Sequence, residues 1–214
     1  GLHELFPWSS NEGWIDYMTP QLYWGINQLP QSYPVLLGWW NEENSKGRHV
    51  WPGMSIGRFQ GKQAIDETIN QIMIARGMLP GSTGVVHWRI GPLIRIENLA
   101  KAISEGPYRR QALVPASPWL SKKIPETPEV KLTREKDTLK ISWDHRNKAE
   151  IARWVIYYKY GALWNHRIHG NSIMNGNLPG YKINMNQLDK VLDSSIDDFN
   201  ELLIPIDRIA ISAV

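Results

Sequence analysis

The hydrophobic pattern of the first 108 residues alternates between strand-like and helix-like segments. Apolar runs typical of buried strands cover residues 16–24, 50–59 and 84–90. Between and after them, apolar positions at helical spacing predict helices over residues 33–44, 62–79 and 97–105. The three strands begin about 34 residues apart, at positions 16, 50 and 84. That spacing fits one β-loop-α unit and predicts parallel strands joined by crossover helices.

Two architectures share this alternation, a doubly wound sheet and a (β/α)₈ barrel. A nucleotide-binding sheet is disfavoured, because the Gly-Ser-Thr-Gly stretch at residues 81–84 lacks both the spacing and the following helix of a phosphate-binding loop. The hydrophobic pattern alone leaves the choice between the two architectures open.

The pattern changes after residue 111. Residues 112–127 are rich in proline and predict a linker that packs against the first domain. Strand-like runs with β-branched and aromatic residues follow, separated by turn-rich stretches, at residues 129–133, 138–143, 154–160 and 207–214. This is the pattern of an all-β sandwich. Residues 185–203 are expected to hold a short helix.

Composition narrows the class of protein. The chain has 214 residues, of which 42% are hydrophobic and 21% charged, as in ordinary globular proteins. No window approaches the ~20 apolar residues of a membrane span, and the first residues are no signal peptide. The net charge of +3 comes from scattered basic residues, which disfavours a nucleic-acid surface. The absence of cysteine excludes disulfides, thiolate metal sites and a cysteine nucleophile.

Tryptophan is concentrated in the first domain, where eight of the eleven residues of this type lie before position 125. Indole rings fill hydrophobic cores, and they also stack on the faces of sugar rings. Composition alone favours core packing and leaves the second role open.

The stretch Trp14-Ile-Asp-Tyr-Met-Thr-Pro-Gln-Leu-Tyr-Trp24 closely resembles a strand of the bacterial glycosyl hydrolase-like 10 family of secreted carbohydrate-active barrels. Three weaker matches follow in the family's order: a helix with paired tryptophans (Trp39, Trp40), a Gly-Val-Val-His strand (Gly84–His87) and a closing motif from Tyr108 to Trp119. The resemblance covers roughly residues 10–120.

The second half resembles a fibronectin type III module. Leu139–His145, Arg153–Gly161 and Ile206–Val214 are similar to its second, third and sixth strands. Two features depart from the pattern. Asp207 stands where the family usually carries a corner tyrosine, and the sequence stops at Val214, before a seventh strand.

Together the resemblances imply an α/β part followed by an all-β part. Residues 1–120 would be the C-terminal segment of a (β/α)₈ barrel, residues 121–128 a linker and residues 129–214 the fibronectin-like sandwich. A barrel takes ~200 residues or more, and residues 1–108 supply only about three units, so both domains are expected to be truncated. The missing N-terminal barrel segment or a partner chain would then cover the open sheet edge. The resemblance also implies a secreted, periplasmic or cell-surface location in bacteria.

Glycoside hydrolysis ordinarily needs two carboxyl groups ~5–9.5 Å apart, which a barrel places at the carboxyl ends of its strands. The predicted strand ends offer no Asp or Glu. Asp16 begins its strand, and the helix residues Glu42, Glu43, Asp66 and Glu67 are interpreted as exposed, solvated carboxylates. No catalytic residue is therefore assigned, and the segment alone is expected to be inactive.

The strand ends instead predict a sugar-binding surface, made of Gln21, Tyr23, Trp24, Arg58, Gln60, His87 and Trp88. The aromatic rings would stack on pyranose faces, and the polar groups would bond hydroxyls. Alternation sends Tyr23 and Trp24 to opposite sides, so at most one faces the pocket and core packing is the alternative. A core histidine is the competing interpretation of His87. The other histidines are scattered, with His166 and His169 in a predicted loop, so no metal or other cofactor is expected.

Three hypotheses remain open. The first is part of a glycoside hydrolase acting on a bacterial or plant polysaccharide, with catalytic carboxylates outside this segment. The second is a carbohydrate-binding protein whose barrel has lost catalysis, and upstream sequence would distinguish the two. The third is a protein-interaction module, which would need Trp154, Tyr157, Tyr158 and Trp164 to form a surface patch.

Overall fold

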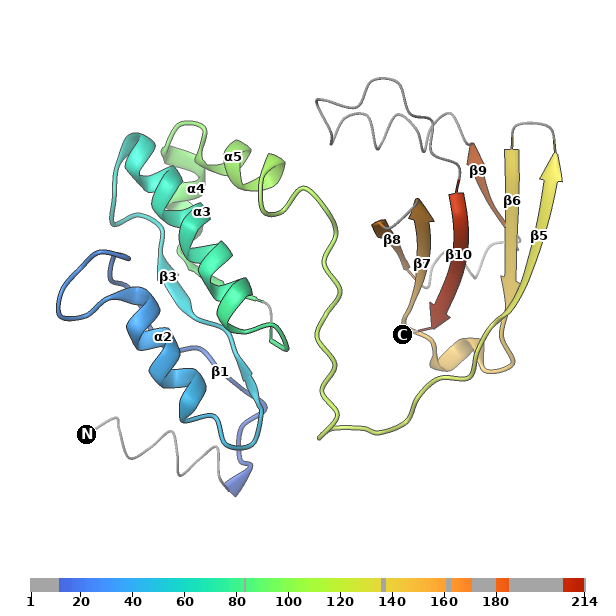
Figure 1. Cartoon of the computed structure of the whole chain (residues 1–214), viewed down its shortest axis with the longest axis horizontal. Coiled ribbons are helices and arrows are strands. Elements are labelled where there is room, and N and C mark those ends of the chain that lie inside the picture. Colours follow the sequence, from blue (N-terminus) through green and yellow to red (C-terminus); the bar gives the residue numbers. More distant parts are fainter. Residues whose placement is uncertain are drawn as a thin grey trace. The chain divides into compact units, whose positions relative to one another are not determined.

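A computed structural model of the chain describes residues 12–82, 84–135, 138–160, 163–170, 180–184 and 206–213. The chain divides into two compact units, Gly1–Ser121 and Lys122–Val214 (Figure 1). The division lies at the start of the predicted linker. That the units are a barrel segment and a fibronectin-like module stays a prediction.

The strands of the first unit pair in parallel. The pairs are β1 (Tyr17–Met18) with β2 (His49–Val50) and β3 (Gly53–Ser55) with β4 (Val86–Trp88). A further parallel bridge joins Gln21 to Gly53 and so continues the first pairing toward the carboxyl end. The parallel pairing of the three predicted strand regions is therefore confirmed.

Proline shortens these strands relative to the prediction. Pro20 and Pro52 interrupt the predicted runs 16–24 and 50–59, because a proline has no N–H to donate to a neighbouring strand. The carbonyl of Pro20 still takes part, since it accepts a 2.8 Å hydrogen bond from the N–H of Gly53. The result is a series of short paired segments in place of long continuous strands.

Four helices belong to the first unit among the described residues. They are α2 (Tyr33–Glu42), α3 (Gly61–Met78), α4 (Ile90–Arg95) and α5 (Leu99–Glu105). Helices α2, α3 and α5 fall where the apolar periodicity predicts them. Helix α4 is not predicted, and the strand expected over residues 84–90 ends at Trp88. No helix among the described residues is long and apolar enough to cross a lipid bilayer.

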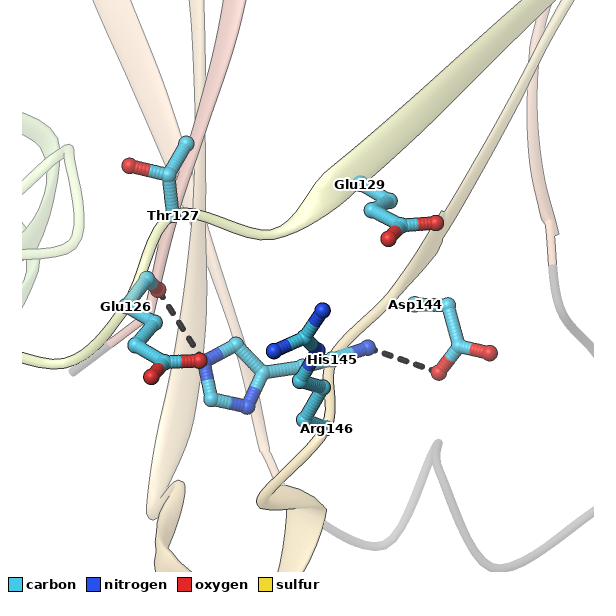
Figure 2. Close-up of a pocket in the computed structure, with 6 residues that line it drawn as sticks. All are labelled: Glu126, Thr127, Glu129, Asp144, His145 and Arg146. Carbon is cyan, nitrogen blue, oxygen red and sulfur yellow. Dashed lines mark hydrogen bonds between the residues drawn. The ribbon is translucent and has the colours of Figure 1, made fainter.

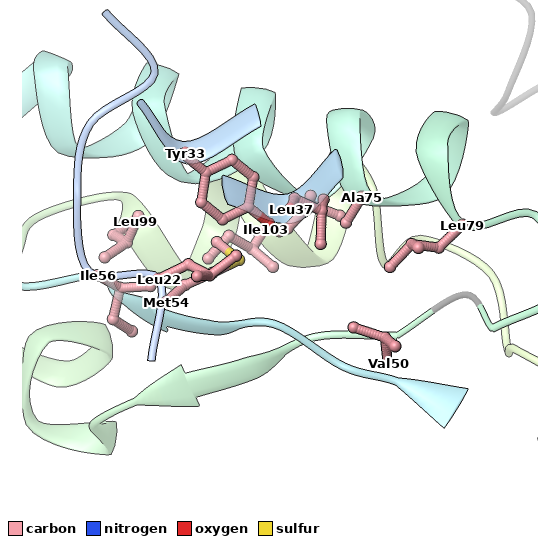
Figure 3. Close-up of a cluster of buried hydrophobic side chains, with 11 residues drawn as sticks. Leu22, Tyr33, Leu37, Val50, Met54, Ile56, Ala75, Leu79, Leu99 and Ile103 are labelled. Atoms are coloured by element: carbon pink, nitrogen blue, oxygen red, sulfur yellow. The ribbon is translucent and has the colours of Figure 1, made fainter. Parts of the chain in front are cut away.

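One hydrophobic core lies between the strands and the helices of this unit (Figure 3). Its buried side chains are Leu22, Tyr33, Leu37, Val50, Met54, Ile56, Ile72, Ala75, Leu79, Leu99 and Ile103. Burial of each large apolar side chain stabilises the fold by roughly 1.5–3 kcal/mol. The helices therefore cover one face of the parallel strands.

The opposite side of the strands carries exposed apolar side chains. Tyr17 is 55% exposed, Val86 41% and Trp88 57%. Leu22 and Ile56, in contrast, are buried in the core.

The described residues of the second unit form two antiparallel three-stranded sheets. One has the order β5 (Glu129–Glu135), β6 (Thr138–Asp144), β9 (Gly180–Asn184), and the other β10 (Ile206–Ala213), β7 (Arg153–Tyr160), β8 (Leu163–Gly170). A 3₁₀ turn, η1 (Lys148–Glu150), precedes β7. The rings of Trp143 and Trp154 lie 6.1 Å apart and join the two sheets.

Two sequence-based expectations for this unit are corrected. His166 and His169 lie in strand β8 rather than in a loop. Trp154 is fully buried, at 0% exposure, so it cannot belong to the surface patch that the protein-interaction hypothesis requires, although Trp164 is 49% exposed. The short helix expected over residues 185–203 lies outside the described residues.

Candidate functional site

The residues after β1 approach β3 closely. The exposed Gln21 pairs with Gly53, and the N–H of Leu22 donates a 2.9 Å hydrogen bond to the carbonyl of Gly53. A Cβ atom at position 53 would lie 3.2 Å from the carbonyl oxygen of Pro20 and 3.6 Å from the ring of Tyr23. Glycine at this position therefore permits the close approach that sets Gln21 and Tyr23 beside β3.

Tyr23 and Trp24 are both half-buried. Neither belongs to a strand, so the alternation expected of them does not apply, and they begin the loop that leads to α2. The carbonyl of Trp24 accepts a 3.0 Å hydrogen bond from Gln71 Nε2 on α3, which fixes the backbone at this point. Half-exposed aromatic rings on a fixed backbone suit stacking on a flat apolar ligand face.

Arg58 and Gln60 lie in the segment between β3 and α3, and both are exposed. Arg58 Nη2 donates a 3.0 Å hydrogen bond to Gln28 Oε1, which lies in the loop after β1. Gln60 is the N-cap residue of α3, and its side chain makes no capping hydrogen bond. The structure thus brings Arg58 to the same loop that Trp24 begins.

His87 and Trp88 lie on opposite sides of β4. Trp88 is exposed, whereas His87 Nε2 lies 2.7 Å from the hydroxyl of Tyr108. Arg76 places its guanidinium 5.8 Å from the centroid of the Tyr108 ring. Burial lowers the pKa of His87, so the ring is neutral at pH 7. This environment favours the core-histidine interpretation, with the Tyr108 hydroxyl as the hydrogen-bond partner of the ring.

Three carboxylates of the first unit, those of Asp16, Asp66 and Glu67, have hydrogen-bond or ion-pair partners. Asp16 accepts a 2.8 Å hydrogen bond from Trp119 Nε1, and Asp66 forms an ion pair with Lys62. Glu67 departs from the expected solvated position, since it is half-buried and accepts a 2.7 Å hydrogen bond from the N–H of Ile26. A partner 41 residues away leaves no signal in helical periodicity.

A pocket of about 290 Å³ lies in the second unit and was not predicted (Figure 2). It is lined by Glu126, Thr127, Glu129, Asp144, His145 and Arg146. The ring of His145 is buried, and Nε2 donates a 3.0 Å hydrogen bond to the carbonyl of Glu126 while Nδ1 accepts one from the N–H of Asn147. Because both ring nitrogens are engaged, His145 ties the linker to the turn after β6 and is not available as a base.

Among the described residues, no group of three or more His, Asp or Glu side chains is arranged to hold a metal ion. The sugar-surface residues predicted from sequence stay the candidate site. Gln21, Tyr23, Trp24 and Arg58 lie near one loop, Trp88 lies on the exposed side of β4, and His87 faces Tyr108.

Comparison with known proteins points to the glycosyl hydrolases. The chain is similar to the Bacillus subtilis protein named Glycosyl hydrolase YngK, with 29% identity over 162 residues. The match covers 70% of this chain and 32% of that protein, so the chain spans about a third of the length of this relative. No protein-family model matches the chain, and no solved structure matches it.

Proposed function

We propose that this chain is part of a glycoside hydrolase acting on a bacterial or plant polysaccharide, and that it supplies substrate-contacting residues but not the catalytic carboxylates. The similarity to a protein named as a glycosyl hydrolase carries the proposal. The predicted strand ends support the absence of catalytic carboxylates from this segment, because they present amide, guanidinium and aromatic groups and no Asp or Glu.

The proposed fold is the C-terminal portion of a (β/α)₈ barrel, followed by a fibronectin type III-like sandwich. Parallel strand pairs with helices against one face support the first part. The exposed side chains of Tyr17 and Val86 support a covering layer on the other face, because a solvent-exposed apolar sheet face is costly in a monomer. Further strand–helix units, from the rest of a longer polypeptide or from a partner chain, would provide that layer.

A binding experiment on the longest available form of the protein tests the sugar surface. Trp24→Ala and Trp88→Ala should each weaken the binding of a soluble polysaccharide by about 1–2 kcal/mol, the contribution of an aromatic contact. Trp164→Ala is the matched control, because Trp164 is an exposed tryptophan of the second unit. Loss of binding in the control, with none in the first two variants, would reject the assignment.

An activity measurement tests whether the catalytic carboxylates lie outside this segment. The purified 214-residue chain should not hydrolyse aryl glycosides. Turnover that a single substitution within the chain abolishes would overturn the proposal that the catalytic carboxylates lie elsewhere.

A carbohydrate-binding protein without catalytic activity is the second candidate, favoured by the same lack of carboxylates at the strand ends. Polysaccharide binding by the longest form without hydrolysis of any bound polysaccharide would select it. For either candidate we propose a location outside the cytoplasm, which cell fractionation of the native host tests.

A further inference from the structure

The loop between β1 and α2 is attached to helix α3 by two side chains. Glu67 Oε1 accepts hydrogen bonds from the backbone N–H of Ile26, at 2.7 Å, and from Gln71 Nε2, at 2.9 Å. Gln71 Nε2 also donates a 3.0 Å hydrogen bond to the carbonyl of Trp24. The two backbone groups that flank Gly25, one acceptor and one donor, are therefore both satisfied from α3.

The spacing of the two side chains suits this task. Residues four apart on a helix lie on the same face, so Glu67 and Gln71 reach the loop together. Gln71 is only 5% exposed, and Glu67 is half-buried. In such a position an unsatisfied backbone group loses its hydrogen bonds to water without replacement, and an anionic acceptor makes a stronger bond than a neutral one. The pair therefore stabilises the conformation of the loop.

Other contacts shape the same loop from within. Ser32 Oγ donates a 2.6 Å hydrogen bond to the carbonyl of Ile26, and the N–H of Tyr33 donates one of 3.2 Å to the carbonyl of Gly25. The Tyr33 hydroxyl in turn donates to the carbonyl of Gln71 at 3.3 Å. Helix α2 thus begins at a point that is already joined to α3, which makes the loop a rigid support.

We propose that Glu67 and Gln71 are positioning residues that hold Tyr23 and Trp24 in the conformation that contacts sugar. The inference rests on the proposed function, because it takes these two rings as the sugar-contacting groups. Glu67 and Gln71 act through the backbone on either side of Gly25. A loop that is ordered before the ligand arrives lowers the entropy lost on binding, so the pair should raise affinity without touching the ligand.

Amide hydrogen exchange of Ile26 tests the attachment itself. Glu67→Ala should speed this exchange by about tenfold or more, because the N–H loses a charged acceptor. Glu67→Gln keeps an acceptor oxygen and should show a smaller effect. Asp66→Ala is the matched control, since it removes the neighbouring carboxylate of the same helix, which pairs with Lys62. Unchanged exchange of Ile26 in Glu67→Ala would overturn the proposal.

Calorimetric titration of the full-length protein tests the consequence for binding. The probes are three linear hexasaccharides, of glucose, of N-acetylglucosamine and of xylose. For a hexasaccharide that binds, Glu67→Ala should weaken affinity by about fivefold with a larger entropic penalty, and Glu67→Gln should restore most of it. Should Glu67→Ala fail to fold, Gln71→Leu removes the donor to Trp24 at similar side-chain volume, with the same expectation.

Failure of the proposed function and failure of the positioning role give different results. Wild-type affinity in Trp24→Ala, together with fast Ile26 exchange in Glu67→Ala, would overturn the proposed function and the positioning role while leaving the attachment in place. Weakened affinity in Trp24→Ala, with unaltered affinity in Glu67→Ala despite fast exchange, would overturn the positioning role alone.

Discussion

The indole Nε1 of Trp119 donates a 2.8 Å hydrogen bond to Oδ1 of Asp16, across 103 residues of sequence. The guanidinium of Arg48 lies 4.6 Å from the centroid of the Trp119 ring, and the ring of His49 lies 4.8 Å from it. His49 Nε2 is also 3.1 Å from Ser117 Oγ. These five residues, which we call the Trp119 latch, fasten the chain after α5 to the amino ends of β1 and β2.

Substitution of Trp119 should destabilise the first unit in two steps. Trp119→Phe removes the hydrogen bond and should cost about 1 kcal/mol, and Trp119→Ala also removes the ring contacts and should cost about 2 kcal/mol. Urea denaturation measures both. In a double-mutant cycle with Asp16→Ala, the cost of Trp119→Phe should shrink, because the acceptor is already gone. Strictly additive costs would contradict the contact.

Acidification should destabilise the protein through His87. Burial lowers the pKa of this residue below its ordinary value of 6.5. The unfolded chain therefore binds a proton at His87 near pH 6.5 while the folded chain does not, so the free energy of unfolding falls as pH drops below 6.5. His87 contributes a loss of unfolding free energy of at most about 1.4 kcal/mol per pH unit. The loss stops once the pH is below the pKa of His87 in the folded protein.

The variant His87→Gln isolates this slope. Urea denaturation at pH 7.5, 6.5 and 5.5 should show a shallower loss of stability in His87→Gln than in the wild type. A residual slope is expected, because burial also lowers the pKa of His49, and burial and the nearby Arg167 lower that of His169. Identical slopes in the two proteins would place the protonation-linked loss elsewhere.

The two tryptophans Trp154 and Trp164 should respond very differently to truncation. Trp154 is fully buried and contacts Trp143 and His145, so Trp154→Ala should cost about 3–5 kcal/mol through the cavity it leaves. Trp164 is half-exposed and lies 5.9 Å from the ammonium of Lys159, so Trp164→Ala should cost less than about 1 kcal/mol. Thermal unfolding of the second unit compares them, and equal losses would show that Trp154 is not a core residue.

Two glycines should give changes of opposite sign when replaced by alanine. A Cβ at Gly84 would lie 2.8 Å from Cδ1 of Trp51, whose ring stacks on His49 with 5.2 Å between centroids. Gly84→Ala should therefore destabilise the fold by about 1–3 kcal/mol. Gly77 lies in α3 with nothing within 4 Å of its added Cβ, so Gly77→Ala should stabilise it by about 0.5–1 kcal/mol. Chemical denaturation of both variants checks the signs.

Sequence periodicity predicts most of the regular elements, and its failures have physical causes. Helix α4 is missed because Gly91 and Pro92 are ordinarily breakers, although a proline in the first turn of a helix costs no hydrogen bond. Strand β8 is missed because its middle, Asn165-His166-Arg167, has no β-branched residue. The strand is stabilised by its pairing with β7, although the intrinsic strand propensity of these residues is low.

The candidate site is less accessible to sequence reasoning, because its key contacts join distant positions. The strand alternation separates His87 from Trp88, yet the Tyr108 hydroxyl that engages His87 comes from beyond two helices. Likewise, the sequence does not show that Glu67 contacts the backbone of Ile26, 41 residues away, whereas Asp66 pairs with Lys62 on the same helix. Hydrophobic periodicity shows which face of a helix or strand is buried, and it does not show which distant residue a side chain contacts.

The Trp119 latch also determines how the first unit bears mechanical load. The latch lies two residues before the end of this unit at Ser121, so tension arriving along the chain from the second unit reaches Trp119 before it reaches α5. The force is then shared between an indole–carboxylate hydrogen bond and the contacts of the Trp119 ring with Arg48 and His49, all at the amino ends of β1 and β2. Tension applied from this side would therefore have to break the contacts of Trp119 before it could separate the helices from the core. The latch is the first set of contacts in the unit to bear the force.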